Sequence, residues 1–432
     1  MNSPVASHKQ ILFRRNVVSG LRLPKALLLY AYYAFIFTLP LQVIDIGISE
    51  FGVSKLFGLA LIAIALTRPK LCFSRPPKAF YFFAAYLAVC TFLGLLFMAD
   101  PQTTGVVPQI VSQLFTQIQL LILFVIGYNL LRSHRVMNVT LLMMALSCIF
   151  MAIAVVAAGA QATVEHSTRE SVFGENPNET ATVFSLGLLA LVGLAYGQKN
   201  TAKKFRILSW ITGPLLLLAV VRTGSRGGLL ALILALFALV IKPHNLRQNL
   251  KAGFIVLIAV VSLAWVSYQI DFVRERWEDT YEKKDIAGRD EIFGAAWDMF
   301  LERPLIGWGP INHLSVLGSR LGLPFRDPHS TYLWVLNETG LLGAIPFFAG
   351  LWFCWRSAWR ARKGQQAVVP VAMLGCLLLV NFKGSGHMDK FFWVTLAYVV
   401  AAGSQVKAFR SLYRNRSFHA AAVGQRTPFQ LS

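Results

Sequence analysis

Long apolar runs recur along almost the whole chain and are separated by polar connections. Each run is continuous rather than alternating, and most approach the ~20 residues that a helix needs to cross a bilayer core about 30 Å thick. Backbone in lipid must satisfy its own hydrogen bonds, so only helices or closed barrels cross, and continuous runs favour helices. The pattern predicts an all-α integral membrane protein with about twelve transmembrane helices, at 25–45, 52–67, 79–98, 109–131, 136–160, 180–197, 207–222, 227–241, 252–270, 330–354, 366–381 and 389–404.

The runs form one membrane domain without an internal repeat. The first run is too long for a signal peptide and lacks a small-residue cleavage site, so we expect it to be retained. The predicted organisation is a cytoplasmic N-terminus at 1–24, transmembrane helices 1–9 at 25–270, a long outer loop at 271–329, transmembrane helices 10–12 at 330–404 and a cytoplasmic tail at 405–432.

Two outer segments are longer than the other connections, at 161–179 and 271–329. A loop of the second length inside a compact domain is usually functional. Within it, Ile292, Ala296, Met299 and Phe300 follow the i, i+4, i+7, i+8 spacing of one helix face. This spacing predicts an amphipathic helix at about 288–302 on the outer membrane surface, ended by Pro304.

Composition agrees with a membrane protein and explains the charge. Hydrophobic residues make up 56% of the chain and charged residues only 14%, against about 25% in soluble proteins. Most of the 41 lysines and arginines fall in loops on one side, whereas all 20 acidic residues fall on the other. The positive-inside rule then places both termini in the cytoplasm. The net charge of +21 is therefore topological, and no nucleic-acid partner is expected.

Metal and disulfide chemistry has little support in the sequence. None of the five cysteines lies in a predicted outer loop, so no structural disulfide is expected. Their spacing does not match a metal site, and we predict neither a metal nor a cofactor.

Several polar groups gather on the predicted outer side, and most are cationic. They are Arg169, Arg222, Arg226, Arg289 and His329. The arginine fork pairs with phosphate oxygens, and several arginines together would hold a diphosphate. At a membrane surface, that group is the head of a polyprenyl lipid carrying a sugar. A neighbouring histidine could take a proton from an attacking hydroxyl.

Each arginine and the histidine also has an ordinary structural interpretation. Arg222 and Arg226 lie near helix ends, where arginine commonly reaches the membrane interface. Arg289 could simply belong to the first turn of the surface helix. His329 could be an entry-loop residue, because Ser330 and Thr331 after it are good helix N-caps.

Two further polar positions are ambiguous. Glu338 lies about eight residues into a predicted span, where a charge costs roughly 2.5–3.5 kcal/mol on insertion scales. It is a functional candidate, or else a neutral or paired carboxyl, with Lys390 or an arginine as partner. Asn176 and Asn178 flank a proline and are first of all turn residues.

Four segments together resemble the O-antigen ligase and polysaccharide polymerase family. They are RESVFGENPNETA (169–181), TGSRGGLLAL (223–232), GRDEIFGAAWDMFLERPLIGWG (288–309) and DPHSTYLWVLNETGLLG (327–343). The resemblance implies a GT-C-like membrane glycosyltransferase in the bacterial inner membrane. Such an enzyme moves a glycan from undecaprenyl diphosphate to an acceptor hydroxyl on the periplasmic side, which is the outer side described above.

The resemblance also implies roles for individual residues. His329 matches the general base, and Arg226 and Arg289 match arginines that bind the donor diphosphate. Arg169 and Asn178 are weaker matches. The implied reaction is a metal-independent inverting displacement, consistent with the absence of an outer Asp-x-Asp pair. Ser330 stands where many members have asparagine after the histidine.

Several activities stay open at this point. A ligase would attach the polysaccharide to lipid A–core, whereas a repeat-unit polymerase would extend a growing glycan. A protein O-glycosyltransferase is less favoured, because no sizeable extra outer domain is evident. A transporter or flippase is the alternative from another class. It would place ionisable groups near the bilayer midplane, whereas here the polar groups gather on one face.

Overall fold

The computed structural model describes residues 23–41, 52–98, 105–158, 176–197, 202–240, 246–282 and 289–424. Over these residues the protein is built from helices and contains no strand, as predicted. A helix lies on each of the twelve predicted spans. They are α2 (Leu23–Thr38), α3 (Val53–Leu66), α5 (Lys78–Met98), α6 (Val107–Leu130), α7 (His134–Ala158), α8 (Pro177–Gly197), α9 (Ala202–Arg222), α10 (Arg226–Val240), α11 (Leu246–Gln269), α15 (Thr331–Ala361), α16 (Val369–Val380) and α17 (Lys390–Gly424).

Six helices in the described part of the chain are long and apolar enough to cross a membrane. They are Lys78–Met98, Val107–Leu130, His134–Val156, Pro177–Ala195, Lys203–Arg222 and Thr331–Ala361. Five further apolar helices are shorter, at Lys25–Leu41, Val53–Leu66, Arg226–Phe237, Val256–Gln269 and Val369–Val380. The protein is therefore a helical membrane protein, while the count of twelve spans and the GT-C class stay predictions.

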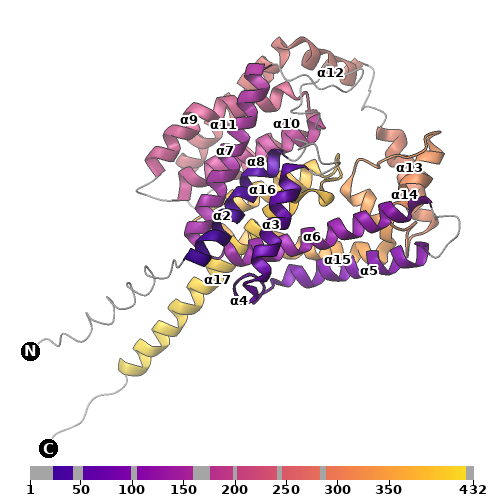
Figure 1. Cartoon of the computed structure of the whole chain (residues 1–432). Coiled ribbons are helices and arrows are strands. Elements are labelled where there is room, and N and C mark those ends of the chain that lie inside the picture. Colours follow the sequence, from indigo (N-terminus) through magenta and orange to yellow (C-terminus); the bar gives the residue numbers. More distant parts are fainter. Residues whose placement is uncertain are drawn as a thin grey trace, which may run out of the picture.

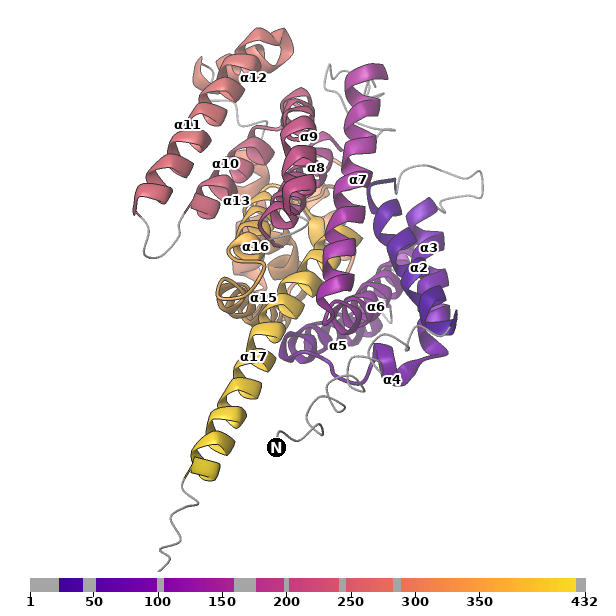
Figure 2. The ribbon, with the colours of Figure 1, turned by 90° about the vertical axis from the view of Figure 1, so that its left-hand side faces the viewer.

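The helices pack in two connected groups. In the first, α15 packs against α5 and α17, and α6 packs against α5 and α17. In the second, α8 packs against α7, α9 and α16, and α10 packs against α16 and α11. Figure 1 shows α5, α6 and α15 running alongside one another, and Figure 2 shows α17 extending beyond the other helices.

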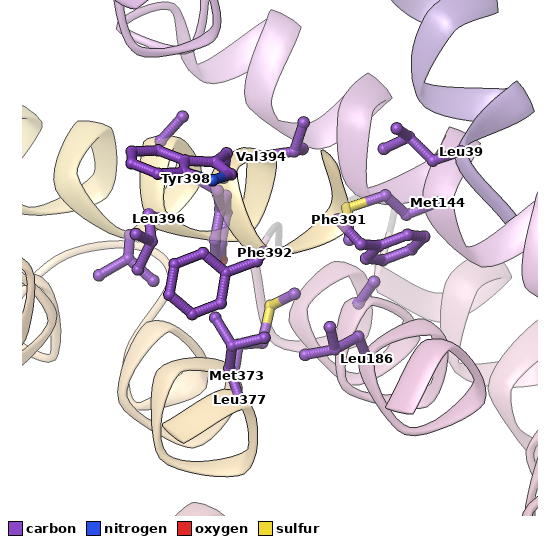
Figure 3. Close-up of a cluster of buried hydrophobic side chains, with 14 of the residues drawn as sticks. Leu39, Met144, Leu186, Met373, Leu377, Phe391, Phe392, Val394, Leu396 and Tyr398 are labelled. Carbon is purple, nitrogen blue, oxygen red and sulfur yellow. The ribbon is translucent and has the colours of Figure 1, made fainter. Parts of the chain in front are cut away.

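The first turns of α17 join the two groups. Figure 3 shows Phe392 of α17 beside Met373 and Leu377 of α16, and Phe391 of α17 near Leu186 of α8. All five side chains are buried. Burial of large apolar side chains is the main favourable contribution to packing in contact with water, but in lipid close van der Waals fit takes over that role. This cluster fixes the loop between α16 and α17 relative to α8.

The long segment after α11 contains three helices, α12 (Asp271–Glu282), α13 (Arg289–Glu302) and α14 (Asn312–Arg320). The predicted amphipathic helix is α13, and its bounds agree with 288–302 to within one residue. All four predicted face residues, from Ile292 to Phe300, are buried. Figure 1 shows α13 and α14 beyond one end of α5 and α6.

One predicted span differs from expectation because α15 is broken. Gly340 has φ 58° and ψ −159°, which is outside the helical region. The loop after α13 fills the break: Trp308 N–H donates to the Asn337 carbonyl (2.7 Å), and Leu342 N–H donates to the Leu305 carbonyl (3.0 Å). Irregular backbone at membrane depth is tolerated when protein satisfies its hydrogen bonds. The sequence pattern gave an uninterrupted run and did not predict the break.

Candidate functional site

His329 lies in a tight turn immediately before α15. Its backbone N–H donates to Oδ1 of Asp327 (2.6 Å), the turn that aspartate commonly forms two residues ahead. Its φ of 49° is in the left-handed region, which this hydrogen bond helps to stabilise. The hydroxyl of Ser385 donates to the same Asp327 oxygen (2.6 Å). A third of the His329 side chain is exposed, so a substrate can reach it.

The start of α15 is attached to the loop between α16 and α17. Thr331 N–H donates to the carbonyls of Asn381 (3.0 Å) and Gly384 (2.8 Å). The Thr331 hydroxyl donates to Oδ1 of Asn381 (2.6 Å). Ser330 occupies the N-cap position, but its side chain makes no capping hydrogen bond. These bonds hold the loop that contains Lys383 against the start of α15.

Arg226 is the first residue of α10, and the residues around it are firmly held. Ser225 caps the helix, because its hydroxyl accepts from Gly228 N–H (3.2 Å). The same hydroxyl donates to Oδ1 of Asn178 at the start of α8 (2.9 Å). A side chain on Gly228 would lie 2.7 Å from Cβ of Ala181, so α10 and α8 approach closely there. Arg226 is therefore positioned by the hydrogen bonds and the close packing of the residues next to it.

Arg289 is the first residue of α13, which is attached to α15. The amide of Asn337 donates to the Ala296 carbonyl of α13 (2.9 Å) and to the Leu333 carbonyl of its own helix (2.9 Å). The buried face of α13 packs with Leu317 of α14 in a small apolar cluster. These contacts, together with the loop that fills the break in α15, fix the distance of Arg289 from His329.

Lys383 lies within electrostatic reach of both Arg226 and Arg289. Burial lowers the pKa of Lys383 below its ordinary value, and the positive charges of Arg289 and Arg226 lower it further. Lys383 also packs against Gly227, whose added Cβ would lie 3.1 Å from Lys383 Cδ. Among the described residues, no carboxylate forms an ion pair with Lys383. The group defined by Arg226, Arg289 and Lys383 is called the cationic cluster below.

His329 responds to the same cluster. Burial lowers the pKa of His329, the Asp327 carboxylate raises it, and the charges of Arg326 and Arg289 lower it. The net shift is downward from 6.5. The imidazole is therefore neutral at pH 7 and can accept a proton, which is what a general base requires.

The other predicted site residues have different outcomes. Arg169 lies outside the described residues. Arg222 ends α9, across a turn from Arg226, and its role in the site stays a prediction. Glu338 is fully buried and accepts hydrogen bonds from the Tyr86 hydroxyl (2.7 Å) and the Gln113 amide. The sequence suggested Lys390 or an arginine as the partner of Glu338. Lys390 instead donates to the Ser54 hydroxyl (3.1 Å).

Asn178 supports the site indirectly. It lies in a turn, as expected, because its N–H donates to Oδ1 of Asn176 (2.9 Å). Its side chain accepts from the Ser225 hydroxyl rather than pointing out as a separate ligand. It belongs with the groups that hold Arg226 in place.

Sequence reasoning missed Lys383 and Arg326. Lys383 follows a predicted span by only a few residues, in the polar stretch NFKGSGHMDK on the side predicted to be outer. Since most lysines and arginines of this chain lie on the predicted inner side, a lysine on the predicted outer side, followed directly by Gly384, was a signal that could have been used.

Comparison with known protein families identifies a family for part of the chain. Residues 211–348 match the family model described as O-Antigen ligase. The match covers about a third of the chain and supports an assignment to the O-antigen ligase family. The match begins within α9 and ends within α15, so it contains Arg226, Arg289 and His329. No curated protein matches the chain in a sequence search.

This assignment to the O-antigen ligase family agrees with the resemblance in the sequence. It supports a ligase- or polymerase-like membrane glycosyltransferase with a lipid-linked glycan and membrane lipids as partners, in the bacterial inner membrane. Lys383 lies beyond the matched residues, and only the folded chain brings it to the cluster.

Proposed function

We propose that this protein transfers a glycan from undecaprenyl diphosphate to an acceptor hydroxyl on the periplasmic face of the inner membrane. The acceptor that we favour is lipid A–core, which makes the protein an O-antigen ligase. Repeat-unit polymerisation by the same site is the alternative, with a growing glycan as acceptor. The two activities share the donor and differ only in the hydroxyl that attacks.

One observation carries the proposal: the cationic cluster and a neutral, accessible histidine lie together. Arg226 of α10 and Arg289 of α13 both act electrostatically on Lys383 in the loop after α16. Arg289 also acts on His329. Arginine and lysine both bind phosphate oxygens, so a diphosphate is the ligand that a site with these three residues favours.

The proposed reaction is a single displacement. His329 takes the proton from the acceptor hydroxyl while its oxygen forms the new glycosidic bond. The bond between the sugar and the diphosphate breaks, and its electron pair stays on the leaving diphosphate oxygen. The attack comes from the face opposite the leaving group, so the anomeric configuration inverts. Base catalysis of this kind contributes about 10²–10⁴ in rate.

The cationic cluster would stabilise the negative charge that develops on the leaving diphosphate. Preorganised groups of this type are worth about 10²–10³ in rate each. The first backbone N–H groups of α10, next to Arg226, add a further positive end for an anion. Since these groups supply the charge that a divalent cation supplies elsewhere, we propose a metal-independent reaction.

Discontinuous helices such as α15 are common in transporters. In this protein the backbone of residues 304–309 fills the break, and Glu338 is engaged by Tyr86 and Gln113. The break therefore serves to join α13 to α15. That use supports a fixed catalytic site better than an alternating pathway.

The test uses purified protein in detergent with a glycan–diphosphate–undecaprenol donor and candidate acceptors. Release of undecaprenyl diphosphate is followed with and without a chelator, for the wild type and for His329→Ala. We expect chelator-resistant release that His329→Ala abolishes, in a variant with an unchanged gel-filtration profile. Comparison of lipid A–core with a glycan acceptor separates ligase from polymerase.

Two results would contradict the proposal. Full release by His329→Ala would remove the histidine from the chemistry and direct attention to Glu338. Movement of intact donor across liposomes, without release with any acceptor, would show that the protein is a transporter.

A further inference from the structure

A large cavity lies far from His329, at the opposite end of α15. Its volume is about 630 Å³, within the range of small-molecule sites. It is lined by the segment before α5, the ends of α6 and α15, and α17. Arg356 and Arg360 belong to the last turns of α15, the helix that begins beside His329. Figure 1 shows α4 and α17 at the end of the molecule opposite to α13 and α14.

Six cations line this cavity: Arg75, Lys78, Arg132, Arg356, Arg360 and Lys407. Among the described residues, none of the six forms an ion pair with a carboxylate. The lining contains no aspartate or glutamate. The ligand that this lining accommodates is therefore an anion with several oxygen atoms, and phosphate is the common biological one.

Inner-side arginines are expected in any membrane protein, so the cavity needs support beyond its charge. Its walls are fixed by specific hydrogen bonds. The amide of Asn129 donates to the Cys72 carbonyl (2.9 Å), which joins α6 to the segment before Arg75. The amide of Gln405 donates to the Leu131 carbonyl (3.0 Å), which joins α17 to the end of α6.

Close helix packing fixes the remaining wall. A side chain on Gly403 of α17 would lie 2.5 Å from the Ser357 carbonyl of α15. By contrast, Arg362 at the same end of α15 is already engaged, with its guanidinium 3.5 Å from the Trp359 ring centre. The six cations thus surround a preformed cavity, whereas Arg362 at the same end is held against Trp359.

The lining also indicates which kind of phosphate compound fits the cavity. Tyr128, Phe353 and Val400 add apolar surface between the cations. A soluble phosphate would contact only the cations of this lining. A lipid would place its charged head group against the cations and its acyl chain against the apolar surface. Basic pockets between transmembrane helices on the cytoplasmic side are known to hold anionic lipid head groups. By the charge distribution, this is the side that we expect to be cytoplasmic.

We propose that this cavity binds the phosphate head group of an anionic phospholipid on the membrane face opposite to the His329 site. Its acyl chains would lie along the apolar residues toward the bilayer. This inference does not depend on the proposed glycan transfer, because the two sites share no residue and the test measures only lipid binding.

The experiment is native mass spectrometry of the full chain after delipidation in detergent. The probes are tetraoleoyl cardiolipin, dioleoyl phosphatidylglycerol and, as the neutral lipid, dioleoyl phosphatidylcholine. Sodium pyrophosphate is the soluble probe. For the wild type we expect one tightly retained anionic lipid and no comparable retention of phosphatidylcholine. The double variant Arg356→Gln/Arg360→Gln should bind the anionic lipid at least about tenfold more weakly.

The matched control is Lys70→Gln/Lys363→Gln, which removes the same charge at the same end but outside the cavity. It should leave lipid affinity within about twofold, since distant surface charges are screened. If Arg356→Gln/Arg360→Gln fails to fold, Arg75→Gln/Arg132→Gln tests the same cavity from its loops.

Three outcomes would overturn the proposal. Unchanged affinity in a folded cavity variant would show that the lipid binds elsewhere. Equal weakening by the control pair would show non-specific attraction to net charge. Binding of pyrophosphate without preference for the lipids would make the ligand a soluble phosphate.

Discussion

Lys383 packs against Gly227 in the first turn of α10, where a Cβ would lie 3.1 Å from the lysine Cδ. The two residues are more than 150 positions apart in the chain. Their contact brings the loop after α16 to Arg226, and the charges of Arg289 and Arg226 lower the pKa of Lys383.

Lys383→Gln should lower kcat/KM for the lipid-diphosphate donor by about 10- to 100-fold. The reason is the loss of one charge-assisted contact, typically about 1.5–3 kcal/mol. Lys383→Arg should retain more activity, because it keeps the charge. Lys363→Gln removes an exposed lysine from the other end of α15 and should have no effect on turnover. A Lys383→Gln enzyme with wild-type kinetics would exclude the lysine from donor binding.

The pH profile of kcat/KM should have an acid limb that reports His329. Because the pKa of His329 is lowered from 6.5, activity should persist below pH 6.5 and fall only when the imidazole becomes protonated. Asp327→Asn keeps an oxygen for the His329 and Ser385 bonds but removes the charge that raises this pKa, so the limb should move to lower pH. Arg326→Gln removes a charge that lowers it, so the limb should move to higher pH. Shifts of both variants in the same direction would contradict the assignment.

Gly340→Ala should destabilise the protein strongly. Its φ of 58° is unfavourable for alanine, and the new Cβ would lie 2.5 Å from the Leu305 carbonyl oxygen. Gly322→Ala is the matched control, since Gly322 has φ 70° but nothing within 4 Å of a Cβ. Gly322→Ala should be destabilised only by the cost of a left-handed backbone at alanine, about 1–2 kcal/mol. Gly340→Ala should be destabilised by more than this. The measurement is the apparent Tm in detergent, and equal Tm values would show that the filled break is not rigid.

Ser225→Ala should destabilise the start of α10 by about 0.5–2 kcal/mol, the usual range for a lost N-cap. It also leaves Asn178 without the Ser225 hydroxyl. Asn178→Ala should cost less, and the double variant should cost less than the sum, because the two share one hydrogen bond. Activity should fall in parallel through misplacement of Arg226. Strict additivity of the two changes in Tm would show that the bond is not energetically important.

The helical pattern was predictable from the chain itself. Each apolar run became a helix, and the spacing of Ile292, Ala296, Met299 and Phe300 located α13 and its buried face. Such features are local, since apolar length and helical periodicity depend on neighbours within a few turns. The motifs around Arg226, Arg289 and His329 are likewise contiguous, and they coincide with the family match.

The tertiary structure alone decided which of these groups meet. Lys383 joins Arg226 and Arg289 only because Thr331 binds Asn381 and Asp327 binds Ser385, contacts that link residues about 50 positions apart. The break at Gly340 depends on the backbone of residues 304–309, which no local pattern contains. Glu338 accepts hydrogen bonds from Tyr86 and Gln113, which are more than 200 positions away, rather than pairing with a cation. Sequence therefore determined the helices and the kinds of chemistry, whereas long-range hydrogen bonds and close packing determined the site.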